Sequence, residues 1–98
     1  MIKATCGINK INVTGHAGYS DYGNDIVCAA VSTAINTTAN AILRINNQAI
    51  KYEDDGNEII ITNLAKDEIT NSLLENLCAV LMSIANQYPK NIKIKTEE

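Results

Sequence analysis

Apolar residues recur along this chain with two different periods. A period of two, in which apolar and polar residues alternate, is typical of strands with one buried face, and a period near 3.6 is typical of helices that bury one stripe. The alternating segments are residues 2–6, 11–15, 49–53, 58–62 and 92–94, and the helical segments are residues 26–45 and 67–87. We therefore predict an α+β fold, a two-layer sandwich with the element order ββαββαβ and with both helices on one face of a single sheet. The order of the strands within that sheet does not follow from the sequence.

Turn-forming residues separate these segments. Residues 7–10 close the first predicted hairpin, and Asp54-Asp55-Gly56-Asn57 closes the second. Pro89 ends the second helix because proline cannot continue the helical hydrogen bonds. The composition, 46% apolar overall, does not change along the 98 residues, so we expect one domain that spans residues 1–98.

The net charge and the cysteines indicate which binding partners and which cellular compartment to expect. The net charge is −3 and the eight basic residues are scattered, which argues against direct binding of nucleic acid and suits a basic protein partner. Residues 1–13 contain charged and polar side chains and lack the apolar run of a signal peptide or a membrane span, so we expect a cytoplasmic protein without membrane association. Three widely spaced cysteines without a CxxC pair do not predict a disulfide framework.

The candidate chemistry lies between the second strand and the first helix. His16, the only histidine, follows the strand that ends at Gly15. Asp25 is a favoured N-cap, and a helix that begins after it places Cys28 at its third position, in the first turn. The free N–H groups and the partial positive charge of a helix start lower the pKa of a cysteine there, and a neighbouring imidazolium lowers that pKa further. The carboxylate of Asp25 opposes this effect because it repels a thiolate.

The residues around this pair carry a family signature. Gly15-His16-Ala17, Gly23 and the run from Asp25 through Cys28 to Ser32 resemble the signature of the ribosomal-processing cysteine proteases of bacteria. The match covers residues 15–32, and the rest of the chain resembles the family in length and element order. The resemblance implies that Cys28 is the nucleophile and that His16 is its base. It further implies that the substrate is the N-terminal extension of a large-subunit ribosomal protein, which is removed before ribosome assembly.

The mechanism expected for such a pair is nucleophilic. His16 deprotonates Cys28, the thiolate attacks a peptide carbonyl, and water later hydrolyses the acyl-enzyme. Backbone N–H groups of the first helical turn, that of Cys28 among them, are the available donors to the oxyanion. Asp21 or Asp25 orients His16, or else the first is a solvated loop residue and the second a helix cap. Ser32, one turn after Cys28, binds the substrate or His16, or its hydroxyl bonds to the Cys28 carbonyl.

The connection formed by residues 17–24 is longer than most strand-to-helix loops. Gly18 and Gly23 bracket a segment that contains Tyr19 and Tyr22. We predict that the two tyrosines cover an extended peptide substrate, with the glycines as the points of motion. The alternative is that the glycines shape a fixed turn and the tyrosines pack on the core.

Other functions use the same residues differently. A non-catalytic ribosome-assembly module would bind its partner through the loop that contains His16 and Cys28. Another cysteine hydrolase or a thiol-transfer enzyme would act on small substrates with the same pair. A zinc site made of His16 and the three cysteines lacks the usual spacing of paired ligands, so we predict no metal and no cofactor.

The outer face of the first helix bears on assembly. Between Ile26 and Leu43 the helix has no charged residue, and its outer face carries small polar side chains. Such a face is either solvated or packs against a second copy of the chain. The resembling family forms homodimers, so we expect a homodimer. Cys6 is predicted to lie in the core, and Cys78, at the edge of the apolar stripe of the second helix, is predicted to be structural.

Overall fold

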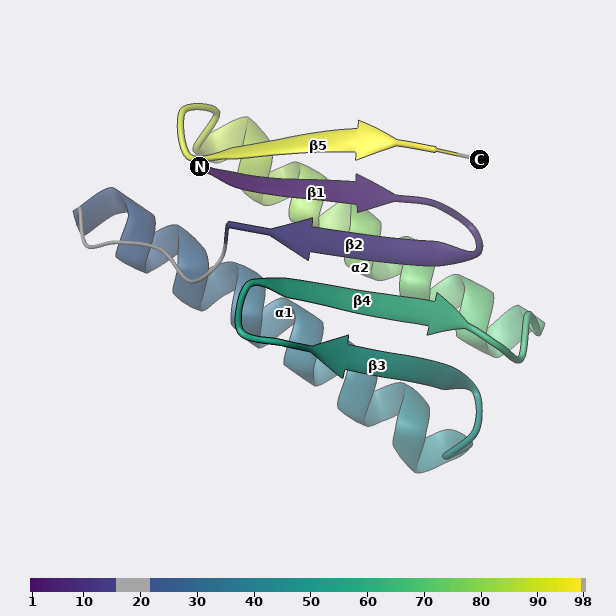
Figure 1. Ribbon diagram of the computed structural model, residues 1–98. Helices are drawn as coiled ribbons and strands as arrows, with labels where there is room; N and C mark the ends of the chain where they lie inside the picture. Colours follow the sequence, from purple (N-terminus) through teal and green to yellow (C-terminus); the bar gives the residue numbers. More distant parts are fainter. Residues whose placement is uncertain (16–21, 98) are drawn as a thin grey trace.

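The structure is a computed structural model that describes residues 1–15 and 22–97, with residues 22–25 described as backbone only. Its elements follow the predicted order ββαββαβ (Figure 1). They are β1 Ile2–Cys6, β2 Lys10–Thr14, α1 Tyr22–Ile45, β3 Ile50–Asp54, β4 Glu58–Asn63, α2 Glu68–Gln87 and β5 Ile92–Thr96.

The five strands form one mixed sheet in the order β3-β4-β2-β1-β5. The hairpin partners β1 and β2, and likewise β3 and β4, are antiparallel, and so are β2 and β4. β5 lies parallel to β1 at the other edge, as expected for a strand reached through a helix. In the register, Ala4 lies between Val13 of β2 and Ile94 of β5, and Val13 lies opposite Ile59 of β4. Inward-facing residues of neighbouring strands are therefore aligned in rows across the sheet.

Both helices cover the same face of this sheet, which confirms the predicted two-layer sandwich (Figure 1). Every second residue of β1 and β2 is buried beneath them. The residues of α1 that face the sheet are Val27, Val31, Ile35, Ala39 and Ile42, and those of α2 are Leu74, Leu77 and Leu81. The core is thus a single apolar layer between the sheet and the two helices.

The segment Ile26–Ile45 of α1 is, by length and composition, the one helix in the described part of the chain that is apolar enough to cross a membrane, with a mean hydropathy of 1.5. Core helices of folded domains pass the same test. Here the inward stripe, from Val27 to Ile42, is 5% exposed or less. The sheet therefore accounts for the apolar residues of this inward stripe of α1.

The start of α2 is held by two polar residues. Asp67 is the N-cap, and its carboxylate accepts a hydrogen bond of 2.8 Å from the backbone N–H of Thr70. Asn63 is 1% exposed, and its side-chain amide donates to the Ile8 carbonyl and to Asn71 Oδ1. Its oxygen accepts from the backbone N–H of Lys66. Asn63 therefore joins the β1–β2 turn, the loop before α2 and α2 itself.

Candidate active site

The sheet ends at Gly15, next to the predicted base. Gly15 has φ +78°, and a Cβ at this position would overlap the carbonyl oxygen of Met1. Only glycine combines this backbone conformation with so close an approach of another backbone. Gly15 therefore fixes the point at which the chain leaves the sheet toward His16. His16 itself, with residues 17–21, lies outside the described residues.

The predicted start of the first helix is wrong. α1 begins at Tyr22, so Asp25 is a residue within the helix and not its N-cap. The preference of aspartate for the N-cap amounts to about 0.5–2 kcal/mol, and further helical hydrogen bonds are enough to offset it. Gly23 and Asn24 disfavour a helix only by roughly 1 kcal/mol each or less, and neither stops it. The predicted loop 17–24 therefore loses residues 22–24 to the helix.

This correction changes the surroundings of Cys28. Cys28 is the seventh residue of α1, in the second turn, and not the third residue as predicted. The electrostatic effect of a helix start falls off within the first turn. The N–H of Cys28 bonds within the helix, because only the first turn has free N–H groups. The helix start therefore does not activate this thiol, and the Cys28 N–H is not free to donate to an oxyanion.

Cys28 lies at the boundary between the buried and the exposed sides of α1. Its side chain is half-buried and packs against the core, beside Val27 and Val31, which are fully buried. Ile26 is 45% exposed. Ser32, one turn further along, is also half-buried, so it shares the side of the helix that carries Cys28. The Cys28 side chain thus packs against the core and remains partly exposed.

The described residues include only part of the predicted site. Gly15, Cys28 and Ser32 are placed as above, and Tyr22, Gly23 and Asp25 contribute backbone to the start of α1. Gly18, Tyr19 and Asp21 lie outside the described residues together with His16. The pairing of His16 with Cys28 and the covering role of the tyrosines remain predictions.

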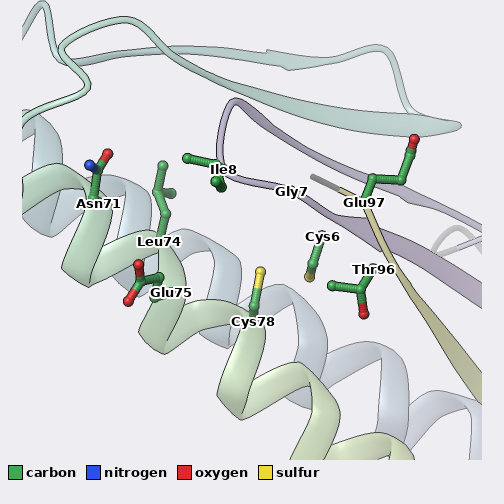
Figure 2. Close-up of a pocket in the computed structure, with 9 residues that line it drawn as sticks. All are labelled: Cys6, Gly7, Ile8, Asn71, Leu74, Glu75, Cys78, Thr96 and Glu97. Atoms are coloured by element: carbon green, nitrogen blue, oxygen red, sulfur yellow. The ribbon is translucent and has the colours of Figure 1, made fainter.

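The other two cysteines, Cys6 and Cys78, line one cavity. Cys6 is 5% exposed in the core and Cys78 is half-buried, which agrees with their predicted structural character. The two thiols affect each other: hydrogen bonding from Cys78 lowers the pKa of Cys6, and the same interaction raises the pKa of Cys78. Both line a cavity of about 260 Å³ between the β1–β2 turn, α2 and the end of β5 (Figure 2). This pairing of Cys6 and Cys78 was not predicted, because a strand and a helix far apart in the sequence bring them together.

The described part of the chain has no group of three or more His, Cys, Asp or Glu side chains that could hold a metal ion. All three cysteines belong to this described part, and all are free. The three cysteines therefore do not gather into the zinc site considered above.

Known proteins resemble this chain along nearly its whole length. The sequence model of the family described as "Cysteine protease Prp" matches residues 1–93. The ribosomal processing cysteine protease Prp of Mycoplasma pneumoniae is 31% identical over 99% of this chain and 96% of its own. The crystal structure of SMU.848 from Streptococcus mutans has a TM-score of 0.86 at 31% identity and covers 98% of this chain and 93% of that chain. The ribosomal processing protease Prp of S. aureus, crystallised with a covalently linked product peptide, has a TM-score of 0.83 at 25% identity, with 99% and 100% covered.

Proposed function

This chain belongs to the cysteine protease Prp family and is a cysteine protease, and from this premise we propose that it removes the N-terminal extension of a large-subunit ribosomal protein before ribosome assembly. The relative from Mycoplasma pneumoniae is named for ribosomal processing, and the match covers nearly all of both chains. The family match over residues 1–93 supports a single protease domain across residues 1–98. The net charge of −3 suits a basic ribosomal protein as substrate.

The catalytic pair in this proposal is Cys28 and His16. His16 takes the proton from the Cys28 thiol, and the thiolate attacks the carbonyl carbon of the scissile peptide bond. The tetrahedral intermediate collapses as His16 returns the proton to the leaving amine, and a thioester remains. Water then hydrolyses the thioester and restores the thiol. The partial exposure of Cys28 supports this role, since a substrate carbonyl has to reach the sulfur.

The supporting residues surround this pair in the chain. Gly15 holds the end of β2 and thereby the start of the segment that contains His16. Gly23 and Asp25 lie in the helix that carries Cys28, and Ser32 follows Cys28 by one turn on the same side. In this proposal they shape the site or contact the peptide, and Tyr19 and Tyr22 contact it as well. The free N–H groups of the first turn lie about 4.5–9 Å before Cys28 along the helix axis, from a rise of about 1.5 Å per residue.

Assembly into a homodimer in the cytoplasm completes the proposal. The outward face of α1 is uncharged between Ile26 and Leu43, and it includes the exposed residues Ile26, Ala29, Thr33, Thr37 and Asn40. A second copy of the chain can cover such a face without burying an unpaired charge. The proposal includes no cofactor, no direct contact with nucleic acid and no membrane. Light scattering coupled to size-exclusion chromatography measures the mass in solution, and a mass near 10.6 kDa contradicts the dimer.

The deciding experiment is cleavage of the extended ribosomal protein, followed by mass spectrometry of the products. The wild-type chain is expected to release one N-terminal peptide. Cys28→Ala and His16→Ala are each expected to abolish cleavage, while Cys78→Ala, a matched cysteine on the other helix, cleaves normally. If Cys28→Ala still cleaves, the nucleophile is misassigned. If the wild-type chain binds the extended protein and leaves it intact, the chain acts as a non-catalytic assembly module.

A further inference from the structure

A second thiol site lies away from Cys28. Cys6, the last residue of β1, and Cys78 of α2 are free thiols that line the same cavity. Figure 2 shows both side chains directed into the space between β1 and α2. A disulfide bond requires the two sulfur atoms to come within ~2.05 Å of each other. The two side chains face each other from β1 and α2, and the adjoining cavity leaves room for the sulfur atoms to approach.

The two thiols differ in acidity. The hydrogen bond from Cys78 lowers the pKa of Cys6, against the opposing effect of burial. The same hydrogen bond raises the pKa of Cys78, and burial and the negative charges of Cys6 and Glu75 raise this pKa further. The first proton therefore leaves Cys6, while Cys78 retains its own. Cys6 is therefore the thiol that attacks an oxidant, and Cys78 is the thiol that then attacks Cys6. This is the arrangement of a nucleophilic and a resolving cysteine.

Small molecules can reach this pair. The cavity has a volume of about 260 Å³, several times the roughly 30 Å³ that one water occupies in the liquid. Its rim includes the exposed residues Ile8, Glu75, Thr96 and Glu97. The cavity borders the β1–β2 turn, whereas Gly15 lies at the opposite end of the same hairpin. The length of β2 separates the two ends by about 16 Å, from a rise of roughly 3.3 Å per residue.

We propose that Cys6 and Cys78 form a peroxide-reactive dithiol that closes into an intramolecular disulfide. The Cys6 thiolate attacks one oxygen of hydrogen peroxide, the O–O bond breaks, and the products are Cys6 sulfenic acid and, after protonation, water. The Cys78 sulfur then attacks the Cys6 sulfur and the S–O bond breaks. The hydroxide leaves with the Cys78 proton as a second water. The two thiols lose two electrons in total, and these electrons reduce one peroxide to two waters.

The disulfide would join β1 to α2 covalently. This inference does not rest on the proposed proteolytic function, because it involves neither Cys28 nor His16. The test uses the full chain with Cys28→Ser, which leaves Cys6 and Cys78 as its two thiols. Hydrogen peroxide is added in slight excess, and the intact protein and its unreduced peptides are analysed by mass spectrometry.

The expected product is a monomer that has lost about 2 Da, with the peptide of Cys6 linked to that of Cys78, and a thiol reductant reverses the change. With Cys78→Ala in the same background, Cys6 is expected to stop as a sulfenic acid, about 16 Da heavier, which dimedone traps. With Cys6→Ala, Cys78 has no partner thiol in the same chain, so the loss of 2 Da is expected to disappear. The wild-type chain, mapped in the same way, has to give the same link, so the test does not depend on a variant that folds poorly. Gain of oxygen without the 2 Da loss, or a link between two chains, overturns the proposal.

Discussion

The two helices begin with similar sequences and in different ways. Asp67 stands three residues before Thr70, and Asp25 stands three residues before Cys28, in each case ahead of an apolar stripe. Asp67 caps α2 and accepts a hydrogen bond from the Thr70 N–H. α1 continues through Asp25 back to Tyr22. Aspartate thus caps the start of α2 and lies inside α1.

The chain before α2 explains why that helix starts after Asp67. Before α2, the N–H groups of Leu64 and Ala65 both donate to the Ala49 carbonyl, and the N–H of Lys66 donates to the Asn63 side chain. Lys66 is held at φ 52°, a conformation that a helix cannot include. Asp67 therefore caps a helix whose preceding residues are held out of the helix by other contacts.

The largest expected effect comes from removing the side-chain hydrogen bonds that hold the start of α2. Asn63→Ala removes three side-chain hydrogen bonds and leaves the Ile8 carbonyl and Asn71 without this partner. We expect the free energy of unfolding to fall by about 3 kcal/mol, because buried polar groups become unsatisfied. Urea unfolding followed by circular dichroism measures the loss. Asn57→Ala, in the exposed β3–β4 turn, is the control and is expected to change stability by less than about 0.5 kcal/mol.

The next largest effect is expected at the fixed point before α1. Gly15→Ala introduces a Cβ at a positive φ and against the Met1 carbonyl, so we expect a loss of about 2–3 kcal/mol in the free energy of unfolding. Gly56→Ala is the matched control, because Gly56 has φ +90° with nothing near its Cβ position. It should lose only about 1 kcal/mol. Equal losses at the two glycines would show that the close approach to Met1 does not affect the free energy of unfolding.

A smaller effect is expected from the two aspartates themselves. Asp67→Ala removes a cap, and we expect the Tm to fall by about 5 °C. Asp25→Ala replaces a residue within α1 by the best helix former, so the Tm should stay within about 2 °C of the wild type or rise. Differential scanning calorimetry of both variants tests this contrast. A drop of similar size in both would restore Asp25 as the start of the first helix.

The smallest expected effect is the pH dependence of the α2 cap. The hydrogen bonds from Thr70 lower the pKa of Asp67 below its ordinary value of 3.8. A lowered folded-state pKa means that the carboxylate contributes stability above pH 3.8, and that this contribution is lost as the pH falls through the folded-state pKa. The Tm difference between the wild type and Asp67→Asn should therefore be present at pH 7 and shrink below pH 3.8. A difference that is unchanged at pH 2.5 would mean that ionisation of Asp67 does not contribute.

The contrast between the helix starts also shows what can be predicted from the sequence. Period and turn residues predict the order ββαββαβ and the common face of the helices, because Ile11 and Val13, like Val27 and Val31, repeat at the spacing of their own element. These are local properties of a strand or a helix. The motif around Cys28 likewise predicts the enzyme class, because it is contiguous in the sequence.

Features that depend on distant segments were not predicted. The parallel pairing of β5 with β1 and the meeting of Cys6 with Cys78 involve residues at opposite ends of the sequence. The buried role of Asn63 depends on the Ile8 carbonyl and on Asn71, and an isolated asparagine after a strand does not reveal them. The position of Cys28 within α1 was mispredicted because Asp25 is a favoured N-cap by residue type, and the local sequence does not distinguish a cap from a residue within the helix.

The pairing of the first strand with the last has a consequence for synthesis of the protein. Ile2 pairs with Ile92, and both residues are almost completely buried in the same core. Until residues 92–96 emerge from the ribosome, β1 has an open edge of unpaired N–H and C=O groups. Contacts between such distant segments also slow folding. The sheet is therefore complete only once residues 92–96 have been made, so a nascent chain that stops before them should lack activity.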